Sequence, residues 1–413
     1  MLERTQFSML DRNRPSVRWL AGLALAAFGF ALPVAMVLAN KSAPAVLILA
    51  TLAGLSAVWL GGAGRQVLDR LRAMLRTQVA MAVLAFAVVA ILSLAWSVDR
   101  SGTLRGLGIA FLMVAASLLA AAALPLIADH TTGWVLVAGL ATASVIAIID
   151  VAAGMRLHAL LGERPAFFDL KRSCIVLVLL FWPAARFLAA RINAWSAPAL
   201  AVPLAAAIEL ISGATAALGL GIGAAALVTA RFAPRALILM AAIGVAGVLI
   251  AAPFAGPLAR HFLASRPVQL FTESHASARV AIWSAFDARF RDRPLLGYGF
   301  DASAHVYLVA RPAGVAANAE ADATIARLHP HNGFLQIWIE LGAAGAIAAA
   351  LFLAAVLRAL ARSPVTRLPW HMALLASALV MALVGFGLWQ AWWSASVASA
   401  AIWFLIVDRT GMS

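Results

Sequence analysis

Apolar runs separated by short polar segments dominate the sequence. An apolar run of about 20 residues is what an α-helix needs to cross the hydrocarbon core of a membrane. Only the length of the run 194–232 requires a turn within it, which we place near Ser212-Gly213. The twelve candidate spans are 17–38, 44–62, 77–96, 105–127, 133–153, 172–190, 195–211, 213–231, 235–256, 332–357, 367–388 and 390–407. The pattern predicts an all-α integral membrane protein with about 12 transmembrane helices.

Composition supports this class of protein and excludes others. Hydrophobic residues make up 64% of the 413 residues and charged residues only 12%, a balance that a soluble protein could not bury. The single cysteine, Cys174, excludes an intrachain disulfide and a cysteine-rich metal site. No small-residue cleavage site follows the first apolar run, so we expect a retained helix with a basic leader rather than a removed signal peptide.

The basic residues cluster in alternate loops, and this clustering predicts an orientation. By the positive-inside rule the arginine-rich loops are cytoplasmic, which places both termini in the cytoplasm. The net charge of +14 does not indicate a nucleic-acid-binding protein, because the arginines form no continuous basic face. The arginines on the predicted cytoplasmic side are Arg4, Arg12, Arg14, Arg18, Arg65, Arg70, Arg72, Arg76, Arg186, Arg191, Arg231, Arg235, Arg358, Arg362 and Arg367.

Two polar segments on the predicted outer side are longer than simple connections. They are residues 154–171 and 257–331, and the second holds five of the eight histidines. We therefore divide the chain into spans one to nine (1–256), a large periplasmic loop (257–331) and spans ten to twelve (332–413). Apolar residues at helical spacing predict an amphipathic helix near 276–290, and we expect its aromatic side chains, Trp283 and Phe286 among them, to lie in the membrane interface.

One motif lies where the long loop enters the tenth span. His331-Asn332 is followed by nine residues and then by Gly342-Ala-Ala-Gly345. At about 100° per residue, Gly342 would return to the helix face of His331, and the two glycines would let another helix pack closely beneath the imidazole. A titratable group at the mouth of a membrane helix is a candidate functional residue. The alternative is a capping or solvated histidine.

This motif resembles the His-Asn/Ser/Gln, nine-residue, Gly signature of the bacterial O-antigen ligases and polymerases, a superfamily of polytopic glycosyltransferases. Arg279–Phe286, leading to Arg293–Phe300, is similar to the family's Arg-x-x-x-Leu/Trp helix and Pro-Leu-Leu-Gly-x-Gly turn. Asp169–Ser173 resembles a helix start where relatives place an essential arginine. One departure is Ser212-Gly213-Ala214, since many relatives carry Ser-Arg-Gly there.

The resemblance implies an O-antigen ligase. It would be an inverting, metal-independent enzyme without a cofactor, in the bacterial inner membrane with its active site facing the periplasm. Its donor would be a glycan on undecaprenyl pyrophosphate, and its acceptor a core-sugar hydroxyl of lipid A-core. His331 would be the base or would orient the acceptor, because a histidine titrates near neutrality. The residues implied to bind the pyrophosphate are Arg172 and Arg279, with Lys171 and Arg266 as weaker candidates, and Asn332, Tyr298 and Gly342 would support the site.

Other interpretations stay open from the sequence. An O-unit or exopolysaccharide polymerase would use the same chemistry with another acceptor, and a transporter or flippase would use twelve spans without chemistry. Arg279 could bind lipid head groups, and Lys171-Arg172 could be a snorkelling pair. The pair Glu320 and Asp322 could hold a divalent cation, although such a pair in a polar stretch is typical of a solvated loop. Glu340 falls half a helical circumference from His331, which argues against a His–Glu dyad.

Overall fold

The computed structural model describes residues 10–11, 13–162, 167–264, 282–284, 286–287, 289–309 and 329–410, and every regular element among them is helical. Three short non-α turns, η1 (Ala27–Ala31), η2 (Ser93–Ala95) and η3 (Ala252–Phe254), continue α1, α5 and α12 respectively. The α-helices are α1 (Pro15–Ala26), α2 (Leu32–Leu38), α3 (Ala43–Leu60), α4 (Gly64–Leu75), α5 (Gln78–Leu92), α6 (Arg100–Ile127), α7 (Thr132–Ala152), α8 (Arg156–Leu160), α9 (Phe167–Arg191), α10 (Ser196–Leu210), α11 (Ala214–Phe232), α12 (Pro234–Ala251), α13 (Ala255–Ala264), α15 (Ser303–Val309), α17 (Gly333–Ala361), α18 (Leu368–Val384) and α19 (Ala391–Thr410).

Each predicted span coincides with a helix of the structure. Ten helical segments in the described residues are long and apolar enough to cross a membrane, and α10 and α18 are shorter apolar helices. The turn expected near Ser212-Gly213 is present, because α10 ends at Leu210, Ser212 has a φ of 52°, and α11 begins at Ala214. The all-helical membrane fold is therefore confirmed, while twelve crossings and their orientation stay predictions.

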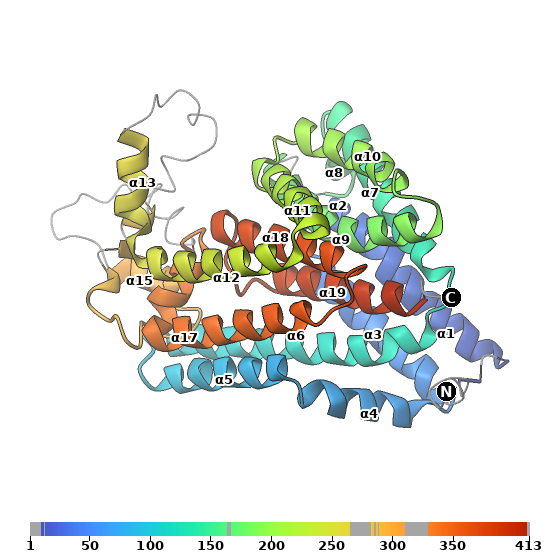
Figure 1. Cartoon of the computed structure of the whole chain (residues 1–413), viewed down its shortest axis with the longest axis horizontal. Coiled ribbons are helices and arrows are strands. Elements are labelled where there is room, and N and C mark those ends of the chain that lie inside the picture. Colours follow the sequence, from blue (N-terminus) through green and yellow to red (C-terminus); the bar gives the residue numbers. More distant parts are fainter. Residues whose placement is uncertain are drawn as a thin grey trace.

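Helix α9 is the centre of the larger part of the bundle. Most side chains from Leu170 to Leu188 are buried, in one apolar cluster with residues of α2, α7, α10 and α19. A second group of helices, α5, α12 and α17, packs side by side (Figure 1). In the same view α1 begins and α19 ends on one side of the molecule, and α13 and α15 lie on the opposite side.

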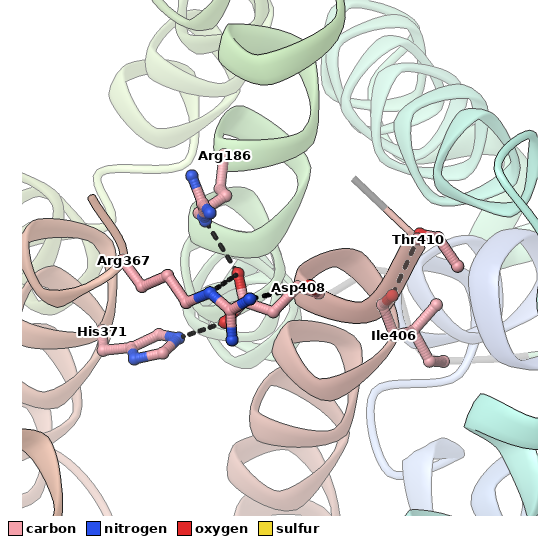
Figure 2. Close-up of polar contacts among 6 residues, drawn as sticks. All are labelled: Arg186, Arg367, His371, Ile406, Asp408 and Thr410. Carbon is pink, nitrogen blue, oxygen red and sulfur yellow. Dashed lines mark hydrogen bonds and ion pairs between the residues drawn. The ribbon is translucent and has the colours of Figure 1, made fainter. Parts of the chain in front are cut away.

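An ionic cluster fastens three of these helices at one end. Asp408 of α19 accepts a hydrogen bond from Arg186 Nε of α9 at 2.9 Å and lies 3.0 Å from His371 Nε2 of α18 (Figure 2). Arg367, which precedes α18, adds a contact of 3.8 Å to the same carboxylate. Removing one partner from such a half-buried network leaves an uncompensated charge. The cluster therefore fixes the register of α9, α18 and α19, whose opposite ends form the site described below.

The described part of the predicted amphipathic helix packs against protein rather than in the membrane interface. Residues 282–284, 286–287 and 289–290 are helical. Phe286 is 1% exposed and belongs to a cluster with Leu335 and Ile339 of α17, while the indole of Trp283 donates to the carbonyl of Pro330 at 2.8 Å. The expectation that Phe286 lies in the interface is wrong, because α17 offers it an apolar face, whereas for the partly exposed Trp283 it stays a prediction.

Candidate active site

Helix α17 begins at a side-chain cap just after His331. Asn332 Oδ1 accepts hydrogen bonds from the backbone N–H groups of Phe334 and Leu335, both at 3.0 Å, as an N-cap residue does. His331 precedes this cap and has a φ of 52°, so it is not part of the helix. The predicted helical phase between His331 and Gly342 is therefore wrong, and Asn332 has a structural role.

Gly342 interrupts α17 instead of lining a helix contact. Its φ of 60° and ψ of −152° lie in a region that only glycine occupies readily. A Cβ at this position would lie 2.4 Å from the carbonyl carbon of Leu295. The prediction that Gly342 admits another helix is wrong, because the close neighbour is the turn formed by residues 294–299.

The 294–299 turn replaces the hydrogen bonds that α17 loses at this break. The N–H groups of Tyr298 and Gly299 donate to the carbonyls of Ile339 and Glu340 at 2.9 and 2.8 Å. In the other direction, the N–H groups of Ala343 and Ala344 donate to Pro294 and Leu295 at 2.9 and 3.2 Å. Backbone groups at membrane depth need such partners inside the protein. The Pro-Leu-Leu-Gly-Tyr-Gly turn is thus joined by hydrogen bonds to the helix that begins at the His-Asn motif.

Tyr298 contributes to this turn through packing and hydrogen bonds. Its hydroxyl lies 3.2 Å from the carbonyl oxygen of Arg289, and its ring lies 5.0 Å from the guanidinium carbon of Arg293. Burial raises the pKa of Tyr298, and the nearby carboxylate of Asp292 adds to this rise. A phenol held in its protonated form beside a turn supports the local fold.

The buried carboxylate of Glu340 joins three segments near the break. It accepts hydrogen bonds from the N–H of Asp301 at 2.7 Å, from the indole of Trp389 at 2.5 Å, from the Gln336 side chain at 2.9 Å and from the Ser303 hydroxyl. These donors satisfy the carboxylate, as a buried charge requires. Glu340 therefore ties residues 301–303 and the α18–α19 connection to the first half of α17.

His331 has a defined orientation. Its Nδ1 lies 2.9 Å from the carbonyl oxygen of Gly385, in the connection between α18 and α19. A carbonyl oxygen can only accept, so Nδ1 must carry the proton, and in the neutral ring Nε2 carries the lone pair. The ring of Phe386 lies 6.4 Å away. The side chain is thus arranged as a histidine base is, with one nitrogen held by the backbone.

Arg172 reaches the same place from the first turns of α9. Its Nη1 donates to Asn40 Oδ1 at 3.0 Å, and its guanidinium carbon lies 5.5 Å from the centre of the Phe386 ring. Phe386 is therefore the shared neighbour of Arg172 and His331. Lys171 is half-buried beside Arg172 at the start of α9. Arg266 and Arg279 lie outside the described residues, so their part in a pyrophosphate clamp stays a prediction.

A sequence profile described as O-antigen ligase matches residues 198–350, which include the 294–299 turn, His331 and Gly342. The resemblance to the O-antigen ligase family is confirmed for this part of the chain. A protein of Rickettsia conorii named "Putative polysaccharide ligase" is 25% identical over 285 residues, which are 66% of this chain and 65% of that protein. One of Rickettsia prowazekii with the same description is 30% identical over 149 residues, 34% and 33% of the two chains. This chain thus matches slightly less than two thirds of the Rickettsia conorii protein.

Three residues next to His331 or Arg172 escaped the sequence reasoning about this family. They are His329, Phe386 and Asn40, which come from separate segments. The available signal for Phe386 was its flanking glycines, since Gly385 and Gly387 interrupt an apolar run. For His329 it was the repeated histidine in His329-Pro330-His331. Asn40 gave no signal beyond its place in a short polar connection.

Gly213, the position at which many relatives carry an arginine, lies beside the site. A Cβ on Gly213 would lie 3.7 Å from Cys174 Cβ, two residues after Arg172. A Cβ on Gly385 would lie 3.5 Å from Thr215 at the start of α11. The α10–α11 turn therefore lies between the start of α9 and the residues that orient His331.

Gly213→Arg is expected to be tolerated and, if Arg172 binds the donor as the family resemblance implies, to restore part of the glycan transfer that Arg172→Ala would lose. Gly213 has a φ of −81°, and the nearest atom to its new Cβ is at 3.4 Å, so the backbone accepts a side chain. Glycan transfer by the double variant is the measurement, with Gly213→Ala in the same background as the control without a guanidinium. Equal activities of the two double variants would show that an arginine here does not reach the donor.

Proposed function

We propose that the protein is a membrane glycosyltransferase that moves O-antigen glycan from undecaprenyl pyrophosphate to a core-sugar hydroxyl of lipid A-core. The carrying observation is the arrangement of His331, whose Nδ1 is held by Gly385, next to the Arg172–Phe386 pair. The family match around His331 supports the same activity. The proposal includes location in the bacterial inner membrane with the site facing the periplasm.

The reaction needs a base and fixed positive charge. Nε2 of His331 takes the proton of the acceptor hydroxyl while the hydroxyl oxygen attacks the anomeric carbon. The bond from that carbon to the pyrophosphate oxygen breaks, and undecaprenyl pyrophosphate leaves with the electron pair. A single displacement inverts the anomeric centre. The guanidinium of Arg172 stabilises the charge that develops on the leaving oxygens.

The proposal involves no metal and no cofactor. Among the described residues no group of three or more histidine, cysteine, aspartate or glutamate side chains is placed to hold a metal ion. Glu320 and Asp322, the acidic pair of the alternative metal route, lie outside the described residues. Metal independence rests on the family resemblance.

Arg172→Ala is expected to lower kcat/KM for the lipid-linked donor roughly 100-fold, and Arg172→Lys less, because lysine keeps the charge but not the planar donor fork. Purified protein in lipid nanodiscs, supplied with donor and acceptor, gives the measurement. Arg156→Ala is the matched control, because Arg156 is an exposed arginine of the short helix α8. An Arg172→Ala protein with wild-type kinetics would remove Arg172 from the donor site.

The lipopolysaccharide profile of the native host without this gene tests the function. Core–lipid A without O-antigen, with long glycan left on undecaprenyl pyrophosphate, is expected for the loss of a ligase. Core carrying a single repeat would identify a polymerase of the same superfamily instead. An unchanged ladder in a host without a redundant enzyme would contradict both. Complementation with the intact gene is the control.

A further inference from the structure

Two histidines form hydrogen bonds with the two ends of the tripeptide 385–387. His329 and His331 are separated by Pro330, and they face Gly385-Phe386-Gly387, here called the 385–387 turn. Nδ1 of His331 donates to the carbonyl of Gly385 at 2.9 Å. The N–H of Gly387 donates to Nε2 of His329 at 3.0 Å. The two imidazole centres are 4.4 Å apart, so the rings pack against each other while each holds one end of the turn.

Steric contacts show how closely the turn fits His329. A Cβ at Gly387 would lie 2.7 Å from Cδ2 and 2.8 Å from Cγ of the His329 ring. A Cβ at Gly385 would lie 2.3 Å from the carbonyl oxygen of Met381. At Gly385 the neighbour is backbone, so glycine is required there, whereas a Cβ at Gly387 would displace the His329 ring. The position of the His329 ring and the path of the turn are therefore coupled.

Phe386 lies between these glycines and connects the 385–387 turn to Arg172 and His331. Its ring lies 5.5 Å from the guanidinium carbon of Arg172 and 6.4 Å from the His331 ring. It also packs edge-on against Trp392 of α19 at 5.1 Å. A shift of the 385–387 turn would thus move the carbonyl that orients His331 and the ring that supports Arg172 together.

The hydrogen bond to His329 requires a neutral ring. Two backbone N–H groups point at its ring nitrogens, that of Gly387 at 3.0 Å from Nε2 and that of His331 at 3.3 Å from Nδ1. A backbone N–H can only donate, so both contacts favour an uncharged ring, and the shorter one assigns the lone pair to Nε2. Burial, together with smaller contributions from the neighbouring His331 and Arg172, lowers the pKa of His329 to about 3. His329 therefore stays uncharged near neutral pH.

We infer that His329 is a positioning residue for glycan transfer. Its uncharged ring holds the 385–387 turn in place, so that the Gly385 carbonyl fixes the tautomer and the orientation of the His331 ring. This inference rests on the proposed function. His329 touches no reacting atom in this scheme. It acts through the backbone of the turn, and its contribution should appear in the rate of the chemical step rather than in donor binding.

The test compares His329→Phe with His329→Gln in purified protein in nanodiscs. Phenylalanine fills the space without an acceptor, whereas glutamine can present an oxygen to the N–H of Gly387. We expect His329→Phe to lower kcat about 10-fold to 100-fold with little change in donor KM, and His329→Gln to keep most of the activity. His305→Phe, the same change at a half-exposed histidine, is the control. Wild-type kcat in His329→Phe would overturn the inference.

Two further measurements separate positioning from a loss of fold. In a His331→Ala background, His329→Phe should cause no additional loss, because residues that act through one group are not additive. In active protein the acid limb of the kcat–pH profile should move to lower pH in His329→Phe, since a carbonyl that no longer accepts from Nδ1 stops stabilising the charged form of His331. An additive loss with an unmoved limb would identify a structural residue instead.

A spectroscopic arm does not depend on activity. The ring-nitrogen shifts of isotope-labelled His331 report which nitrogen is protonated. We expect a uniform Nδ1–H form in the wild type and a mixture of the two tautomers in His329→Phe. A uniform Nδ1–H form in both proteins would overturn the inference. Wild-type protein with this tautomer but without glycan transfer would refute the proposed function alone. If His329→Phe fails to fold, Gly387→Ala is the second variant, because it disturbs the contact between Gly387 and the His329 ring from the other side. It should also give a mixture of the two His331 tautomers.

Discussion

Replacement of His331 by alanine is expected to lower the turnover of glycan transfer by about 10²-fold to 10⁴-fold, the range that a general base contributes. In the proposed reaction Nε2 takes the proton, because Nδ1 is committed to the carbonyl of Gly385. Donor binding should change little, since the proposal assigns the imidazole to the acceptor hydroxyl and not to the donor. The measurement is single-turnover transfer by purified protein, together with the lipopolysaccharide profile of the host that expresses the variant.

A second substitution decides between a base and an orienting group. His331→Asn keeps a donor near the place of Nδ1, which can still reach Gly385, but offers no basic nitrogen. If His331 is the base, asparagine should be as inactive as alanine. Substantial activity in His331→Asn would leave only an orienting role. His305→Ala is the control, because His305 is a half-exposed histidine whose neighbour is Asp99 at 3.5 Å.

Gly342→Ala is expected to destabilise the protein by about 3 kcal/mol or more. Its backbone conformation is strained for any L-residue, and the added Cβ would lie 2.4 Å from the backbone of Leu295. That neighbour is backbone, so it cannot rotate away as a side chain could. The midpoint of thermal unfolding in detergent and the yield of folded protein are the measurements.

The matched control for this substitution is Gly247→Ala in α12. No atom other than its own helix lies within 4 Å of the new Cβ, and alanine is the better helix former by up to about 1 kcal/mol. This variant should unfold at the same temperature as wild type or above it. A Gly342→Ala protein with an unchanged midpoint would mean that α17 runs unbroken through this position.

The membrane helices could be predicted from the sequence because their signal is local. A run of apolar residues long enough to cross a bilayer is visible without any knowledge of its neighbours. Even the turn inside the run 194–232 was placed correctly, at Ser212-Gly213. The His331 region could be singled out as a candidate site from spacing and resemblance, and its role in catalysis stays a prediction.

The geometry of that region could not be predicted, because it depends on distant segments. The nine residues between Asn332 and Gly342 predict that His331 and Gly342 share one helix face. In the structure these residues form the first part of α17, from its N-cap to its break. The break needs the 294–299 turn, about forty residues away, to supply its hydrogen bonds. Likewise, Phe386 becomes part of the site only when the α18–α19 connection meets α9. These contacts have no signature within a short window of sequence.

The hydrogen bonds shared by the 294–299 turn and the middle of α17 also determine how this protein could be recombined with its relatives. A chimera that takes the 294–299 turn from one parent and α17 from another would join a turn to a helix break that it did not fold with. Residues 339–344 should therefore come from the same parent as residues 294–299 in any such exchange. Crossovers that keep these two short segments from the same parent are expected to give folded chimeras.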